Sequence, residues 1–175
     1  MLKLIGIVIA VLILALLITA ATRPDHFRVE RMATIEAPPE KIYPLIEDFH
    51  RWPAWSPYEK LDPAMKRTIS GPASGKGAVY EWSGNSKAGQ GRMEIVAAEP
   101  STHVGIQLDF IKPIKAHNMA DFNLQPQADG TRVTWVMNGR NTFLGKVMSL
   151  FFDVDKMVGK DFEAGLANMK TVAER

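Results

Sequence analysis

Hydrophobic and polar residues recur along the chain with two different periods. Alternation with a period of two predicts one strand over residues 27–36 and a run of consecutive strands over 66–140, since the alternating segments there are separated by turn signals. Between them, Ala37-Pro38-Pro39 favours a helix start, and Pro44 requires that helix to be short, kinked or restarted. The proline-bounded aromatic stretch over 52–58 predicts an irregular segment.

The last stretch, from Thr142 to Glu174, has the period of a helix. Its apolar residues recur at spacings of three or four with one longer gap, at Leu144, Met148, Phe151, Val158, Phe162, Leu166 and Met169. This spacing predicts one long helix whose apolar stripe lies on the sheet. Gly159 and Gly165 fall inside the pattern and indicate a close approach of another part of the chain.

The amino-terminal segment from Leu4 to Ala21 carries no charge. As a helix it reaches about 27 Å, close to the roughly 30 Å of a bilayer core. A cleaved signal peptide is the alternative, but its apolar region is usually about 7–15 residues long. We therefore expect a transmembrane signal anchor over residues 1–22 and one domain over 23–175. Lys3 favours an inside amino end and a domain on the outer, periplasmic side, although Arg23, Arg28 and Arg31 follow the segment.

The predicted sheet has an apolar face that another element must cover. Only the carboxy-terminal helix is long enough, so the sequence predicts an α+β fold with an antiparallel sheet packed on that helix. Arg31 shares the phase of the inward residues of its strand. It either reaches solvent at the end of the strand or points into a cavity.

The ordered set of elements resembles a known superfamily. The segments that carry the likeness are Ile35–Lys41, Trp52–Pro57, Gly75–Trp82, Gly130–Trp135 and Gly165-Leu166. They resemble the helix-grip superfamily of START domains, plant pathogenesis-related proteins and bacterial polyketide cyclase/dehydrase-like lipid-binding proteins. The resemblance implies a START-like fold, with a curved sheet that grips the last helix and a hydrophobic pocket between them. It carries over no catalytic residues.

Composition and motifs limit the chemistry. The 21 basic and 19 acidic residues leave a net charge of +2, which does not indicate a nucleic-acid partner. Cysteine is absent, and His26, His50, His103 and His117 are scattered without metal-ligand spacing. The segment Gly71–Gly77 is one residue short of a phosphate loop and precedes a strand. We expect no metal, no cofactor and no catalytic motif.

The candidate ligand-binding residues are mainly aromatic and soft side chains. They are Trp52 and Trp55 in the irregular segment and Tyr80, Trp82, Met93, Asn118, Phe122 and Trp135 in inward phases of strands. Such side chains line small-molecule pockets, although plain core packing explains them equally well. Asn118 is the one polar member and needs a partner inside an apolar interior.

Three functions fit this pattern. We expect a membrane-anchored binding protein for a hydrophobic small molecule or lipid. The alternatives are a cyclase/dehydrase-type enzyme and an interaction module with a filled core. The sequence indicates no oligomeric state.

The segment from Phe143 to Phe152 holds more bulky apolar residues than one helix face can bury. The surplus, which includes Phe143, Val147, Leu150 and Phe152, is either covered by the segment over 52–58 or forms a hydrophobic gate that touches the membrane.

Overall fold

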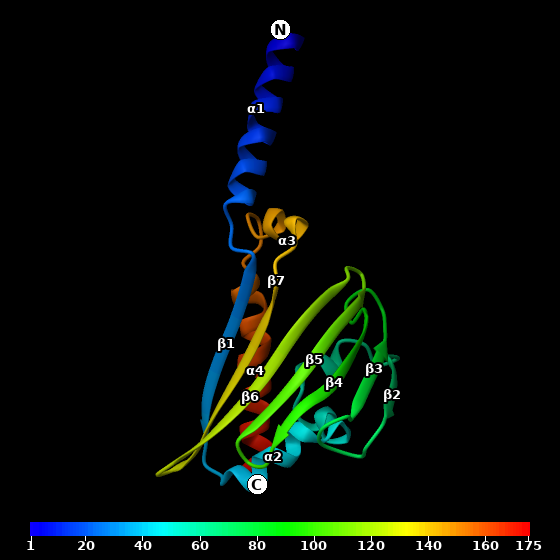
Figure 1. Ribbon diagram of the computed structural model, residues 1–175, viewed down its shortest axis with the longest axis vertical. Helices are drawn as coiled ribbons and strands as arrows, with labels where there is room; N and C mark the ends of the chain where they lie inside the picture. Colours follow the sequence, from blue (N-terminus) through cyan, green and yellow to red (C-terminus); the bar gives the residue numbers. More distant parts are fainter.

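A seven-stranded antiparallel sheet wraps around one long helix in the computed structural model, which describes residues 1–175 with the side chain of Leu2 excepted (Figure 1). The sheet order is β1-β7-β6-β5-β4-β3-β2. The strands are β1 (His26–Ile35), β2 (Lys66–Ser70), β3 (Val79–Ser83), β4 (Gln90–Glu99), β5 (His103–Lys112), β6 (Ala116–Gln127) and β7 (Gly130–Arg140). Consecutive hairpins join β2 to β7, and β1 pairs with β7 from His26↔Arg140 to Ile35↔Thr131. The predicted α+β helix-grip fold is confirmed.

Helices and 3-10 turns account for the other elements. They are α1 (Leu2–Ala21), α2 (Pro39–Glu47), η1 (Phe49–Ala54), η2 (Pro57–Lys60), α3 (Phe143–Met148) and α4 (Val154–Ala173). The helix α2 is short and contains Pro44, as the sequence predicts. The proline-bounded aromatic segment forms the 3-10 turns η1 and η2.

The helix α4 lies lengthwise on the concave face of the sheet, behind β1, β7 and β6 in the view of Figure 1. Phe162, Leu166 and Met169 of this helix are buried, as the apolar period predicts. A Cβ atom on Gly165 would lie 2.8 Å from Cζ3 of Trp135, and one on Gly159 would lie 2.0 Å from Nη2 of Arg31. Both glycines therefore allow the close approach that the sequence indicates.

The prediction of one helix over 142–174 is wrong, because the chain forms two helices with a turn over 149–153. Asp153 ends the turn, and its Oδ1 atom accepts a hydrogen bond from the Lys156 N–H at 3.0 Å, which caps a new helix. The first part of the predicted stripe therefore does not face the sheet: Leu144, Met148 and Phe151 are exposed. Of the four surplus residues, Phe143 and Phe152 are exposed and Val147 and Leu150 are half-buried, so the alternative in which residues 52–58 cover all of them is wrong.

The end of the sheet far from α1 is closed by aromatic side chains of η1 and the segment after it. The indole N–H of Trp52 donates to the Ile46 carbonyl at 2.9 Å, and that of Trp55 donates to the Leu45 carbonyl at 2.7 Å. These bonds fix both rings under α2, where Phe122 packs edge-on against each. This half of the interior is thus filled.

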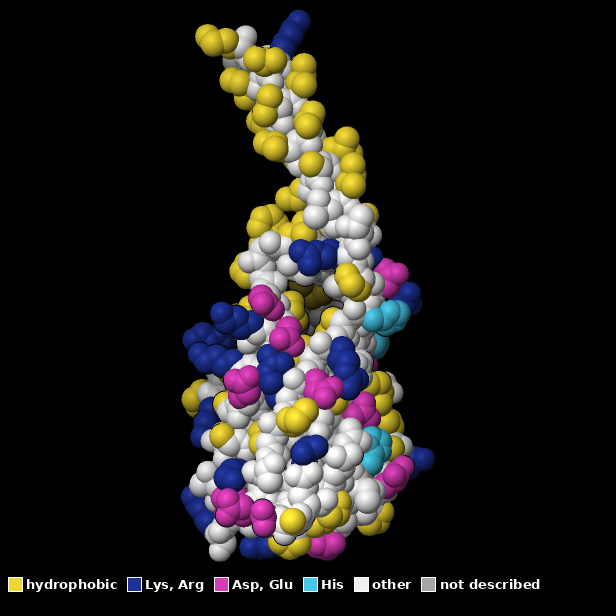
Figure 2. Space-filling model, turned by 90° about the vertical axis from the view of Figure 1, so that its left-hand side faces the viewer, with side chains coloured by type: hydrophobic (Ala, Val, Ile, Leu, Met, Phe, Trp, Pro, Cys, Tyr) yellow, Lys and Arg dark blue, Asp and Glu magenta, His cyan; other side chains and the backbone are white. Residues whose placement is uncertain are grey.

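The other end of the sheet lies next to α1. The register brings together the start of β1, the end of β7, the turn between β5 and β6, and the turn between β3 and β4. The start of α4 and the helix α3 lie at this same end, directly below α1 (Figure 1). The helix α1 projects away from the body of the protein, and the face that Figure 2 shows carries mostly hydrophobic side chains, with a basic side chain at the tip.

Candidate functional site

An apolar cavity of about 240 Å³ lies between α4 and the strands β3 to β7. From α4 it is lined only by the first half of the helix, through Val158, Asp161 and Phe162. From β5 it is lined by Ile106, Leu108 and Phe110, and Phe110 is close to the end of the strand. The cavity therefore occupies the half of the interior that is nearer to α1.

The cavity collects most of the residues that the sequence singles out. Trp52, Tyr80, Trp82, Met93 and Trp135 line it. The ring of Trp82 lies over β4, because the partner residue Gly91 has no side chain: a Cβ atom there would be 2.3 Å from Cη2 of Trp82. The inward phase of these strand residues was enough to find them.

Three candidate residues lie elsewhere. Trp55 and Phe122 are fully buried in the aromatic cluster beyond the cavity, with their ring centroids 6.0 Å apart. Asn118 is only 7% exposed and lies beside Gly139 and Phe27 at the start of β6. Among the described residues, none donates a hydrogen bond to its Oδ1 atom.

Trp135 is the residue that joins the filled and the hollow parts of the interior. Its ring stacks on Phe162 with centroids 3.9 Å apart and planes 5° apart, and it lies 4.8 Å from the ring of Phe122 on another side. The stack fixes the position of α4 above the sheet. It also makes Trp135 both a core residue and a wall of the cavity.

A polar network that sequence reasoning missed lies at the wall of the cavity. The Tyr80 hydroxyl donates to Oε1 of Glu59 at 2.6 Å, and the Arg67 guanidinium donates to Oε2 at 2.6 Å. Burial is the largest cause that raises the pKa of Tyr80, and the hydrogen bond to Glu59 adds to it. Each carboxylate oxygen of Glu59 thus has a partner, which a buried charge requires. The three residues of this network come from η2, β2 and β3, and no sequence spacing connects them.

Acidic and basic side chains also line the cavity. Asp161 is exposed on α4 and lines the cavity, and partial burial raises the pKa of its carboxyl. Burial, reinforced by the charge of Asp161, also raises the pKa of the Tyr58 hydroxyl. Lys87 lines the cavity from the turn between β3 and β4. The lining of the cavity therefore includes one carboxyl group and one ammonium group beside its apolar walls.

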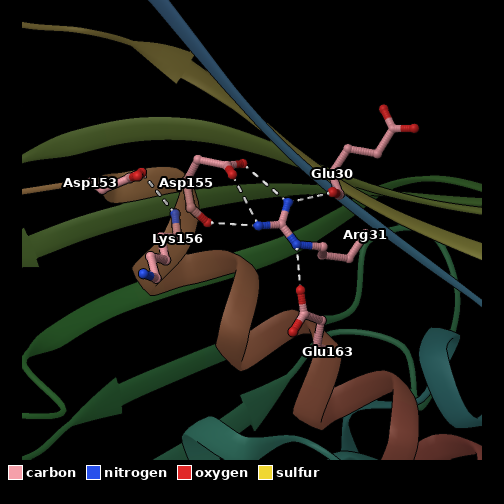
Figure 3. A network of polar contacts seen from close by, with 6 residues as sticks. All are labelled: Glu30, Arg31, Asp153, Asp155, Lys156 and Glu163. Atoms are coloured by element: carbon pink, nitrogen blue, oxygen red, sulfur yellow. Dashed lines mark hydrogen bonds and ion pairs between the residues drawn. The ribbon is translucent and has the colours of Figure 1, made fainter.

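Arg31 fixes the start of α4 on the sheet (Figure 3). Its guanidinium donates to the side chain of Asp155 at 3.0 and 3.1 Å, to the Asp155 carbonyl at 3.1 Å and to Glu163 at 2.8 Å. These hydrogen bonds raise the pKa of Arg31, and the bond to Asp155 is the largest cause. The sequence left open whether Arg31 reaches solvent or a cavity, and the structure shows that it crosses to α4 over Gly159.

The comparison with known families agrees with this architecture. The family described as polyketide cyclase/dehydrase and lipid transport matches residues 26–174, which is nearly all of the chain outside α1. The chain belongs to this family. Membership in the polyketide cyclase/dehydrase and lipid transport family indicates hydrophobic ligand binding or a cyclase-like activity. No curated protein matches the chain.

Solved structures support the same fold. The protein MLL2253 from Mesorhizobium loti is 16% identical with a TM-score of 0.63, and the match covers 85% of this chain and 98% of that one. The di-domain ARO/CYC protein BexL of the BE-7585A biosynthetic pathway is 14% identical with a TM-score of 0.64, and the match covers 90% of this chain and 53% of that one. The major latex-like protein 151 of Panax ginseng is 11% identical with a TM-score of 0.61, and the match covers 85% of this chain and 97% of that one. At these identities the likeness concerns the fold alone.

The described residues contain no group of three His, Asp or Glu side chains that could hold a metal ion. The apolar cavity is the candidate functional site, because it collects most of the residues that the sequence singles out.

Proposed function

We propose that this protein is a membrane-anchored binding protein for a hydrophobic small molecule or lipid, which it holds in the cavity between the sheet and α4. The observation that carries the proposal is the cavity itself, whose walls are aromatic and aliphatic apart from a few polar groups. Pockets for small ligands have this composition. Its volume of about 240 Å³ is slightly below the usual lower bound of roughly 300 Å³. Met65, Met93 and Met137 line it, and their flexible side chains allow it to expand.

The helix α1 supports the membrane part of the proposal. Residues 3–21 form a helix that is long and apolar enough to cross a bilayer. Its large side chains are exposed to the surroundings rather than packed on the domain. A helix that is apolar on all sides and unburied is poorly suited to water. We infer that α1 is the anchor, with the domain on the outer side.

The polar groups of the cavity favour binding over catalysis. Each oxygen of Glu59 already accepts a hydrogen bond, one from Tyr80 and one from Arg67, so the carboxylate is held within the protein's own network. One observation favours the alternative, a cyclase/dehydrase-type enzyme: Asp161 has a raised pKa at the wall of the cavity, beside Tyr58. A raised carboxyl pKa suits a general acid. If this alternative holds, Asp161→Asn abolishes turnover of an added substrate without loss of its binding.

The test fills the cavity without breaking the fold. Ala120 lines the cavity in the middle of β6, and Ala33 lies on the same face of the sheet outside it. The full chain in detergent micelles is titrated with 1-naphthol or with decanoate while tryptophan fluorescence is recorded. We expect a saturable change, and we expect Ala120→Leu to weaken binding about tenfold or more, because overpacking costs about 1–3 kcal/mol.

The matched control is Ala33→Leu, which adds the same atoms to the same face and should lower stability without weakening binding. A signal that every variant shows equally reports partition of the probe into the micelle. Saturable binding that Ala120→Leu leaves unchanged, or no saturable binding of either probe, would overturn the proposal.

A further inference from the structure

We propose that the exposed apolar side chains at the α1 end of the domain form a membrane-contacting rim, which lies in the headgroup region of the bilayer that α1 spans. The rim consists of the segment from Phe143 to Phe152 and the turn between β5 and β6. This inference rests on the proposed anchor function of α1. It adds that the domain itself touches the lipid and that the mouth of the cavity lies against the membrane.

The helix α3 is held at the foot of α1 by specific contacts. Lys146 forms an ion pair with Asp25, which stands four residues after the end of α1. The Asn141 N–H donates to the Asp25 carbonyl at 2.7 Å, and the Asn141 side chain donates to the Pro24 carbonyl at 3.4 Å. The helices α1 and α3 are in contact. These contacts fix the position of α3 relative to α1.

Exposed large apolar side chains concentrate at this end of the domain. They are Ile111, Ile114, Phe143, Leu144, Met148, Phe151, Phe152, Val154 and Met157. Elsewhere on the described domain such side chains are few and scattered, at Met32, Leu61 and Met119. Figure 2 shows hydrophobic side chains at the foot of α1, continuous with those of the helix, and a hollow with hydrophobic side chains just below them. Apolar surface that is continuous with a membrane-spanning helix meets the same bilayer.

The turn between β5 and β6 reaches the same end from the other side of the sheet. The register places it beside the turn between β3 and β4, since Lys112 pairs with Gln90. Ile111 at the end of β5 and Ile114 in the turn are exposed, and each stands next to an exposed lysine, Lys112 and Lys115. Apolar side chains flanked by lysine suit an interface in which the apolar part enters the acyl boundary and the ammonium groups meet anionic headgroups.

The lining of the cavity reaches the same end of the domain. Phe110 lines the cavity and directly precedes Ile111, and Val158 lines it and directly follows Met157. Lys87 and Ala88, in the neighbouring turn, are lining residues as well. A hydrophobic ligand that leaves the bilayer between α3 and the β5–β6 turn would reach the cavity with little exposure to water. The rim thus specifies the source of the ligand as the membrane itself.

The absence of cysteine makes a direct test possible, because one introduced cysteine carries the only label. The full chain is reconstituted in vesicles of phosphatidylcholine and phosphatidylglycerol, with an environment-sensitive fluorophore at Phe151→Cys or Ile114→Cys. Lipids that are brominated near the headgroup serve as quenchers. We expect both labels to be quenched.

Two matched positions separate this inference from the proposed anchor. Met32→Cys labels an apolar side chain that is 58% exposed, at a point about 20 Å along β1 from its first residue. It should not be quenched. Ile9→Cys labels the middle of α1 and, if α1 spans the bilayer, should be quenched by lipids that are brominated near the ends of their acyl chains.

The outcomes are distinct. Quenching at position 9 but not at 151 and 114 overturns the rim and leaves the anchor intact, whereas no quenching at position 9 overturns the anchor. Labels at 151 and 114 that are shielded from aqueous iodide but not quenched by the lipids assign the surface to another protein or a second copy, and also overturn the rim. The double variant Lys112→Gln, Lys115→Gln should reduce quenching at 114 more than at 151.

Discussion

The two parts of the carboxy-terminal stretch, residues 143–152 and 154–173, share one apolar period but have opposite surroundings. In α4, Phe162 is 2% exposed and stacks on Trp135. In the segment around α3, Phe151 is 64% exposed and lies near the foot of α1. The periodicity alone assigns both residues to the same buried stripe, so another property must decide which part grips the sheet.

Charge distribution is that property. In α4, charged residues such as Lys156, Lys160 and Glu163 cover the side opposite the stripe, and two glycines allow close contact with the sheet. In the segment 143–152 the only charged residue is Lys146, which is itself buried against Asp25. A helix with one polar and one apolar face packs its apolar face on the sheet and exposes its polar face to water. A segment without a polar face has to meet protein or lipid on more than one side.

The largest expected effect compares the two phenylalanines. Phe162→Ala should destabilise the domain by about 3–5 kcal/mol, because it leaves a void under Trp135. Phe151→Ala should change the stability by less than about 0.5 kcal/mol, since its side chain is exposed. Urea unfolding of the full chain in detergent, followed by far-ultraviolet circular dichroism, measures both.

Circular dichroism is preferred to fluorescence here, because truncation of Phe162 also changes the surroundings of Trp135. Equal losses of stability in the two variants would show that the segment 143–152 is core, and would remove the distinction between the two parts.

A smaller effect is expected at the glycines. Gly165→Ala places a Cβ atom 2.8 Å from the Trp135 ring, which cannot move aside because Phe162 and Phe122 hold it. We expect a net destabilisation of about 1–2 kcal/mol, in which overpacking exceeds the gain in helix propensity. Gly145→Ala is the matched change in α3, where the nearest atom, at 2.6 Å, is Oδ1 at the end of the Asn141 side chain, which can rotate away. It should be neutral or stabilising by up to about 1 kcal/mol.

Thermal unfolding of these two variants beside the wild-type protein provides the measurement. A stabilising Gly165→Ala would mean that the helix does not approach the sheet as closely as its contacts with Trp135 indicate.

The same comparison shows what the sequence could predict. Strand alternation located β1 within one residue at each end, and inward phases found Tyr80, Trp82, Met93 and Trp135 on the cavity wall. The break before α4 was missed, because the cap of Asp153 competes with helix continuation through a single local hydrogen bond. An apolar period extends across such a break without a visible change.

The cavity was only partly predictable for a different reason. Trp55 and Phe122 are aromatic like the lining residues, and Phe122 also shares their inward phase, yet both lie in the filled half of the interior. Which aromatic residues border empty space depends on how η1 and α2 close one end of the sheet. The network of Glu59, Arg67 and Tyr80 depends on the same tertiary arrangement.

The smallest expected effect concerns acid stability, and it compares the link that holds each part. The hydrogen bonds from Arg31 lower the pKa of Asp155 in α4, and the bond from Lys146 lowers the pKa of Asp25 beside α3, both from 3.8. A carboxyl whose pKa is lower in the folded state stabilises the fold above its unfolded pKa, and this contribution is lost as the pH falls through the folded value. Below about pH 4, Arg31→Gln and Lys146→Met should therefore each lose less stability than the wild-type protein.

At pH 7 the two variants should differ: Arg31→Gln lowers the melting temperature, because α4 loses its attachment to β1, whereas Lys146→Met leaves it nearly unchanged and loosens only α3. Melting temperatures between pH 2.5 and pH 7 test this. Apart from Glu163, which also loses its partner in Arg31→Gln, the other carboxyls keep their partners in all three proteins. If Lys146→Met lowers the neutral melting temperature as much as Arg31→Gln, the segment 143–152 belongs to the cooperative core, and the two parts of the stretch differ only in exposure.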